Sequence, residues 1–166
     1  MKIGGVVVSG PNVEILVLPR PTNNIVIKAQ TVADFKEFER MVPYPTAPGV
    51  RTKDGFKKDT KAPAYRDEVS RYESLRFAWM VITSLAPSEI EWETVNLDQP
   101  QTWLKWEEEF KKAGLSEVEV NKITLTVMQA NSLDESKLQA AREAFLLGQQ
   151  VVASDISGQD TEPESI

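Results

Sequence analysis

The three consecutive carboxylates Glu107, Glu108 and Glu109 are the side chains with the most obvious capacity for chemistry in this sequence. A pair of carboxylates can act as general acid and general base when both face the same substrate. Consecutive residues of a helix point about 100° apart, so only two of the three share one side. Lys111 and Lys112 follow at the spacing that pairs opposite charges on a helix. The pattern therefore favours a solvated helix face over a catalytic pair.

The chain contains no histidine and no cysteine. Ser-His-Asp and Cys-His catalysis, zinc sites built on these residues and disulfides are thereby excluded. Gly4 and Gly5 lack the third glycine of a dinucleotide fingerprint, and Asp54 and Asp59 miss the spacing of a calcium loop. A hydrolase that uses carboxylates alone stays open, although no pattern indicates one. We expect no catalytic, cofactor-binding or metal-binding residue, and a protein that is not an enzyme.

The tryptophans are the second group that deserves a functional interpretation: Trp79, Trp92, Trp103 and Trp106. Aromatic rings can stack nucleic-acid bases, but they then need basic neighbours, whereas acidic residues flank Trp92 and follow Trp106. Trp103, Trp106 and Phe110 lie at helical spacing, which favours a place in the core. The alternative is a protein-binding groove, where tryptophan is a frequent anchor. Trp92 and Trp103 are our candidate partner-binding residues.

Charge is distributed unevenly along the 166 residues, whose net charge is −6. Residues 1–83 carry 13 basic and 9 acidic side chains, whereas residues 84–166 carry 6 basic and 16 acidic ones. An acidic half argues against nucleic-acid binding and leaves two interpretations open, a basic protein partner or a solvated surface. The apolar runs are far shorter than the ~20 residues of a membrane span. The first ten residues lack the apolar core of a secretory signal, so a cytosolic protein without a membrane partner is expected.

The segments that position these residues predict an α+β fold. Residues 13–18 and 25–29 have β composition and flank a turn cluster, so they predict a hairpin, to which residues 2–8 could add a third strand. A short helix with Phe35, Phe38 and Met41 at helical spacing follows and ends at Pro43. We therefore expect an N-terminal β-hairpin or small antiparallel sheet with a short helix in residues 1–42. Residues 43–63 are expected to form a basic, proline-rich linker, and a dedicated binding loop is the alternative.

The rest of the chain predicts a mainly helical region of four to five helices. A long helix is expected over residues 64–85, an extended segment over 89–97, and a helix from about residue 98 to Gly114. Two capping boxes, Ser116 with Glu119 and Ser132 with Glu135, predict the starts of two further helices. The helical region is thus expected over residues 64–149. The composition of residues 150–166 is typical of a disordered acidic tail.

Most of the chain resembles a family of tailed-bacteriophage proteins, the tail assembly chaperones. The N-terminal part of the resemblance comprises Leu18-Pro19-Arg20, Ile25-Val26-Ile27-Lys28-Ala29 and the residues Phe35, Phe38 and Glu39. The part from Arg76 to Gly148 comprises Trp92-Glu93-Thr94-Val95, Pro100-Gln101-Thr102-Trp103 with Trp106, Ala113-Gly114-Leu115-Ser116 with Glu119-Val120-Asn121, Val127-Met128-Gln129-Ala130-Asn131, and Leu133-Asp134-Glu135 before Ala141-Arg142.

The resemblance implies a non-virion protein of the host cytoplasm that works in tail morphogenesis. Its implied partners are the tape measure protein, which such chaperones coat, and the major tail protein, which they help to deliver. It implies no catalytic residue, and self-association stays open. Two alternatives also stay open: a phage-encoded inhibitor of a host defence protein, and a minor structural component of the virion. Gene position separates them, because a chaperone gene should lie between the genes of the major tail protein and the tape measure protein.

Overall fold

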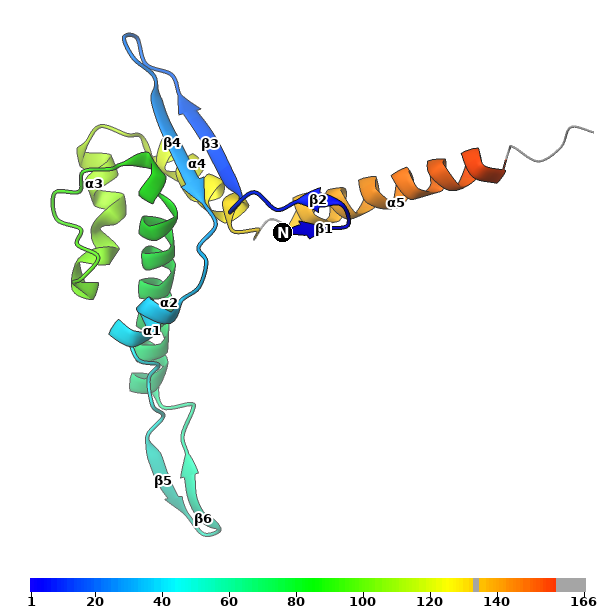
Figure 1. The fold of residues 1–166 in the computed structure, drawn as a ribbon. Helices are drawn as coiled ribbons and strands as arrows, with labels where there is room; N and C mark the ends of the chain where they lie inside the picture. Colours follow the sequence, from blue (N-terminus) through cyan, green and yellow to red (C-terminus); the bar gives the residue numbers. More distant parts are fainter. Residues whose placement is uncertain (133–134, 158–166) are drawn as a thin grey trace, which may run out of the picture. The chain divides into compact units, whose positions relative to one another are not determined.

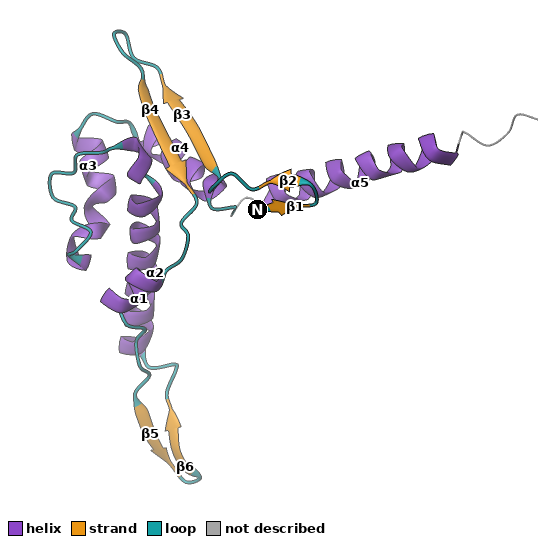
Figure 2. Ribbon diagram, in the orientation of Figure 1, coloured by secondary structure: helices purple, strands orange, loops and turns teal. Residues whose placement is uncertain are grey.

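The computed structural model describes residues 1–132 and 135–157 and has the expected α+β architecture (Figure 1). Small antiparallel hairpins alternate with helices along the first part of the chain (Figure 2). The chain divides into two compact units, residues 1–131 and residues 132–166. The first unit therefore combines the predicted N-terminal hairpin with most of the predicted helical region. One core draws on residues 16–42 and 72–130.

Six strands form three separate two-stranded antiparallel hairpins: β1 (Lys2–Ile3) with β2 (Val6–Val7), β3 (Val13–Leu18) with β4 (Ile25–Gln30), and β5 (Gly49–Thr52) with β6 (Gly55–Lys58). The predicted hairpin is thus confirmed as β3 and β4. Residues 2–8 do not add a third strand to this hairpin. They turn at Gly4 and Gly5, so that β1 pairs with β2 instead. Helices, rather than a third strand, cover the inner face of β3 and β4.

The strands β3 and β4 bury one face and expose the other, as period-two alternation requires. Leu18, Ile27 and Ala29 are buried in the core. Val13 and Ile15 lie on the opposite, exposed face. The hairpin is therefore anchored by every second side chain, and its outer face stays apolar.

The helices are α1 (Lys36–Met41), α2 (Pro63–Ser84), α3 (Trp106–Lys112), α4 (Glu117–Ala130) and α5 (Glu135–Ser157), with two short 3₁₀ helices, η1 (Ala86–Ser88) and η2 (Pro100–Lys105). The helix expected from residue 98 is therefore a 3₁₀ helix that continues into α3. The capping box of Ser116 and Glu119 is confirmed at the start of α4. Ser132 has a left-handed φ of 56°, whereas an N-cap residue is extended, so it does not cap α5. Residues 133–134 lie outside the described residues.

The predicted linker over residues 43–63 contains the hairpin of β5 and β6. Its strands pair in register from Gly49 opposite Lys58 to Thr52 opposite Gly55. A φ of 115° at Gly55 completes the turn, a conformation that glycine adopts without steric cost. The prolines that predicted a linker therefore lie on either side of an ordered hairpin. Residues 43–63 are not one continuous loop.

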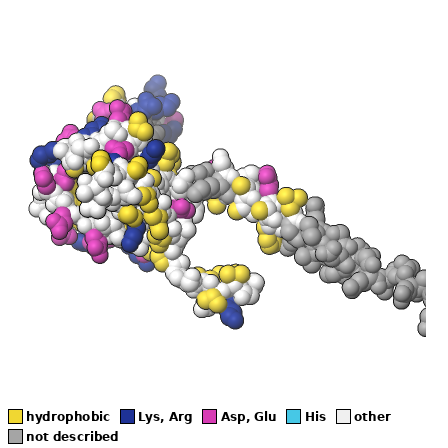
Figure 3. All heavy atoms as spheres, turned by 90° about the horizontal axis from the view of Figure 1, so that it is seen from above, with side chains coloured by type: hydrophobic (Ala, Val, Ile, Leu, Met, Phe, Trp, Pro, Cys, Tyr) yellow, Lys and Arg dark blue, Asp and Glu magenta, His cyan; other side chains and the backbone are white. Residues whose placement is uncertain are grey.

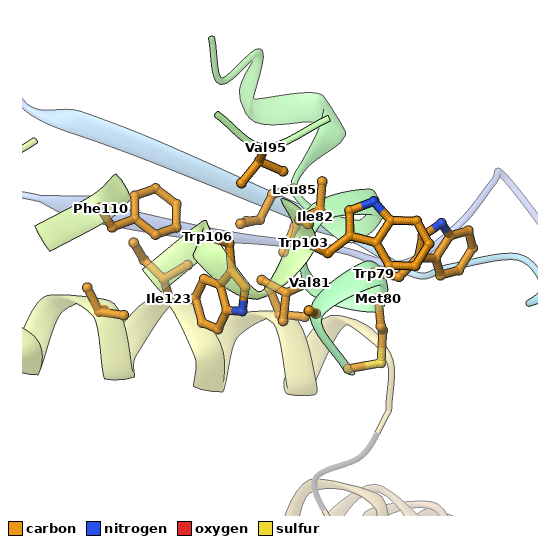
Figure 4. Packing of buried hydrophobic residues seen from close by; sticks show 14 of the residues in the cluster. Trp79, Met80, Val81, Ile82, Leu85, Val95, Trp103, Trp106, Phe110 and Ile123 are labelled. Atoms are coloured by element: carbon orange, nitrogen blue, oxygen red, sulfur yellow. The ribbon is translucent and has the colours of Figure 1, made fainter. Parts of the chain in front are cut away.

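The core lies between the C-terminal half of α2, the segment of η2 and α3, helix α4 and the inner face of β3 and β4 (Figure 4). The buried residues of α2 include the continuous run from Ala78 to Ile82. A run that is buried on all sides identifies this end of α2 as the central helix of the unit. Phe38 anchors the short α1, since its ring lies 5.2 Å from that of Tyr72 and 6.0 Å from that of Trp103.

An ion pair joins the loop after β3 to the start of α4. Arg20 donates to Glu119 at 2.5 Å, and the same carboxylate accepts the backbone N–H of Ser116 at 2.9 Å. The Arg20 hydrogen bond, with the Ser116 backbone second, lowers the pKa of Glu119 from 4.5 to about 2. The capping-box carboxylate thus also holds the β-hairpin against the helix.

This pKa shift makes the stability of the fold depend on pH. The unfolded carboxyl titrates near 4.5, so its stabilising effect is complete above that pH and is lost as the pH falls towards about 2. We expect Glu119→Gln to lower the melting temperature at neutral pH, and the difference from the parent to shrink between pH 4.5 and 2. Glu117→Gln, on the exposed side of the same first turn, is the control. A difference in melting temperature that stays constant from pH 4.5 to 2 would contradict the stabilising role of the ionised Glu119 carboxylate.

The sequence pattern predicts that the last helix ends near residue 149, whereas α5 extends to Ser157. The rest of the predicted disordered tail, residues 158–166, lies outside the described residues. Of the helices in the described part of the chain, none has both the length and the apolar character that crossing a membrane requires.

The compact unit of residues 1–131 has a core of its own, which leads to a prediction about truncation. A chain that ends at Gln150 should melt at the same temperature as the full chain, within the error of a thermal scan. The physical reason is that no residue beyond 131 belongs to the core cluster of the described chain. A clear drop in melting temperature would show that the removed residues pack.

Candidate functional site

An apolar groove of about 340 Å³ lies in the first unit, between β4, the segment after η1 and the end of α3. Its apolar lining consists of Ile25, Val26, Ile27, Ile90, Trp92, Phe110, Ala113 and Leu115. Its polar lining consists of Ser88, Glu91, Glu93, Glu109 and Lys112. The groove therefore has an apolar floor and a rim of three carboxylates and one ammonium group. We call it the Trp92 groove.

Ring contacts connect Trp92 to the core. Its ring lies 5.3 Å from that of Phe110, and Phe110 contacts Trp106 edge to face at 6.1 Å. Phe110 and Trp106 are buried, whereas Trp92 is only half-buried. Aromatic pairs at these distances contribute beyond the area they bury. Trp92 is thus held in place from below, while part of its ring remains accessible from the groove.

The carboxylate of Glu109 holds the chain segment that carries Trp92. It accepts the backbone N–H groups of Glu93 at 2.9 Å, Thr94 at 2.6 Å and Val95 at 2.8 Å, and also the Thr94 hydroxyl. Burial alone would raise the pKa of Glu109, but these hydrogen bonds outweigh it and hold the pKa below its ordinary value. The carboxylate therefore stays ionised and fixes one side of the groove.

These contacts correct part of the expectation for the three consecutive carboxylates. Glu109 is half-buried and bound to backbone, so it does not belong to a solvated helix face. Glu107 and Glu108 are exposed, as expected. Lys112 forms its ion pair with Glu93 across the rim, at 2.7 Å, rather than with Glu108 on its own helix.

The free edge of β4 borders the same groove. Neighbouring residues of an antiparallel strand point their N–H and C=O groups alternately towards the partner strand and away from it. Lys28 points away from β3, because Ser88 Oγ accepts its N–H at 2.7 Å and donates to its C=O at 2.8 Å. By the same alternation Val26 also points outward, and neither of its groups meets a hydrogen-bond partner within the described residues. The groove thus offers one free N–H and one free C=O beside an apolar floor.

Of the two candidate partner-binding residues, only Trp92 lies at this site. Trp103 is 0% exposed, and its indole N–H donates to the Asn96 C=O at 3.0 Å. The prediction that Trp103 contacts a partner is therefore corrected: its ring fills the core beside Phe38. Sequence reasoning did not single out Ile25, Val26 or Phe110 as groove residues. The spacing of Ile90 and Trp92 on one face of an extended segment was the available signal.

Apolar side chains are exposed at other places as well. On the compact unit they form a band between charged side chains in the view of Figure 3. The outer face of β3 and β4 carries Val13, Ile15, Val17 and Val26, each at least 45% exposed. Helix α5 exposes Leu138, Phe145, Leu146 and Leu147. Exposed apolar patches of this kind are typical of proteins that bind other proteins.

Within residues 1–132 and 135–157, no group of three acidic side chains is arranged to hold a metal ion. In comparisons with known proteins, the chain matches no protein-family model, no curated protein and no solved structure.

Proposed function

We infer that this chain is a phage tail assembly chaperone, which acts in the host cytoplasm by binding rather than by catalysis. Its partners are the tape measure protein and the major tail protein, as the resemblance implies. The observation that carries the proposal is the Trp92 groove, in which an accessible tryptophan, a free strand edge and a carboxylate rim come together. These features fit an extended segment with apolar side chains and nearby basic residues.

Each feature of the groove has a role in holding such a segment. The outward N–H and C=O of Val26 can pair with the backbone of an added strand, which provides affinity without selecting a sequence. The floor beside Trp92 takes an apolar side chain out of water, where it would otherwise favour aggregation. Glu91 attracts a neighbouring cation. A long, partly folded partner would be kept soluble in this way until assembly.

The test is co-expression with the tape measure protein of the same genome. We expect the chaperone to raise the soluble yield of the tape measure protein and to purify in a complex with it. If the tape measure protein stays insoluble and no complex purifies, the proposed function loses its support. A gene position outside the structural cluster would instead favour the inhibitor of a host defence protein.

A substitution in the groove tests the site separately from the function. We expect Trp92→Ala to weaken partner binding by about 2 kcal/mol or more, because a half-buried tryptophan is a typical anchor of an interface. Isothermal titration with a purified partner segment measures the effect. Leu104→Ala, which removes an apolar side chain that is 48% exposed and does not line the groove, is the matched control. A complex that forms equally well with both variants would place the binding site elsewhere.

A further inference from the structure

The hairpin of β5 and β6 presents an aromatic side chain to solvent between two cations. Every residue from Gly49 to Lys58 is exposed, and Phe56 is 78% exposed. The pairing of Arg51 with Phe56 and of Gly49 with Lys58 puts these four residues on one face of the hairpin. A two-stranded hairpin is marginally stable by itself, and an exposed aromatic side chain is typical of a binding surface. This face therefore has the composition of an interface.

The ring of Phe56 lies across Gly49, where an added Cβ would approach the ring Cε1 to 1.9 Å. A residue larger than glycine at position 49 would therefore displace the ring. Phe56 thus packs on a glycine of its own hairpin while most of its side chain stays exposed.

The Trp92 groove complements this face in two respects. Its apolar floor matches the ring of Phe56. The exposed carboxylate of Glu91 matches the charges of Arg51 and Lys58, whereas that of Glu93 already pairs with Lys112. Opposite charges at the rim of an interface steer association and fix its register.

We propose that the β5–β6 hairpin of one copy of this chain docks in the Trp92 groove of a second copy. Phe56 lies on the groove floor, and Arg51 and Lys58 lie beside Glu91. The contact joins two different surfaces, so one copy keeps a free groove and the other a free hairpin, and further copies can add.

This self-association stands on the two surfaces alone and does not depend on the proposed chaperone function. Where that function holds, the same contact regulates it, because a docked hairpin covers the groove until a partner segment displaces it.

The test is the mass of the full-length protein, measured by light scattering and analytical ultracentrifugation from micromolar to millimolar concentration. We expect the mass to rise with concentration at low salt, and less so at high salt, because salt screens the exposed charges. Phe56→Ala and Trp92→Ala should each raise the dissociation constant about 30-fold or more, as loss of an interface anchor does. Val50→Ala, on the opposite face of the hairpin, is the matched control and should associate like the parent.

Mixing the two variants gives the sharpest result. The Phe56→Ala chain keeps an intact groove and the Trp92→Ala chain keeps an intact hairpin, so their mixture should form a complex of two chains and no larger one. Matching thermal melts of the variants and the parent exclude unfolding as the cause. The charge reversals Arg51→Glu and Glu91→Lys should each weaken association. Mixing the two reversed chains should restore it.

Three outcomes would overturn the proposal: a parent protein that stays monomeric at millimolar concentration and low salt, a Phe56→Ala chain that associates like the parent, or a mixture of the two variants without a complex. None of these experiments contains a tail protein. The self-association can therefore fail while the chaperone function stands, and the reverse also holds.

Discussion

Replacing Trp103 with alanine is expected to destabilise the compact unit by about 3–5 kcal/mol, the cost of deleting a large aromatic side chain from a core. The side chain is 0% exposed, and its ring contacts that of Phe38 at 6.0 Å. The substitution leaves a cavity at the junction of η2, α1 and α2. Typical domains have a total stability of about 5–15 kcal/mol, so a large part of it would be lost. Chemical denaturation followed by circular dichroism measures the change.

Leu104→Ala is the matched control for this experiment, since Leu104 is the next residue of the same 3₁₀ helix and is 48% exposed. We expect it to cost about 1 kcal/mol or less, as substitutions at the surface usually do. Trp106, at 3% exposed, should behave like Trp103. A Trp103→Ala chain that unfolds like the parent would return Trp103 to the candidate partner-binding residues.

Replacing Asn131 with alanine is expected to cost about 2–4 kcal/mol, because its amide joins three parts of the fold and the substitution leaves their polar groups unpaired. Its Oδ1 accepts the backbone N–H of Val32 at 2.8 Å. Its Nδ2 donates to Ser84 Oγ at 3.2 Å and to Val127 C=O at 2.8 Å. Ser84 in turn donates to Gln30 C=O, so the loss would reach the end of β4.

Asn121→Ala is the control for this second prediction, since Asn121 is an exposed asparagine of α4. It should change stability by no more than about 0.5 kcal/mol. Asn131→Asp keeps the acceptor for Val32 and loses the donor to Ser84 and Val127, so it should fall between the alanine variant and the parent. Equal stability of all three variants in a urea titration would show that the Asn131 network contributes nothing to the fold.

The short-range features of this protein were readable from the sequence because each depends on residues close together in the chain. The β composition of residues 13–18 predicts a strand, and Ser116 with Glu119 predicts a capped helix start. Both are confirmed. The hairpin over residues 49–58 was missed, since prolines on either side favoured a loop. The Asp54-Gly55 dipeptide was the turn signal that could have indicated it.

Tertiary packing decided which of these residues are accessible. Trp92 and Trp103 were both candidate partner-binding residues, yet one lines a groove and the other is enclosed by α1, α2 and η2. Burial depends on which distant elements meet, and local spacing carries no information about that. The same reason applies to Glu109, whose carboxylate is half-buried only because the segment of residues 93–95 folds back onto α3.

The sequence by itself therefore determined the α+β class, the β3–β4 hairpin, most of the helices, and the absence of histidine and cysteine chemistry. Only the tertiary structure brought Val26, Trp92 and Phe110 together from three separate elements to form the groove. It also left the edge of β4 without a partner strand at Val26, and it placed Phe56 on an exposed hairpin. Each of these features arises from contacts between residues far apart in the chain, and such contacts exist only once the chain has folded.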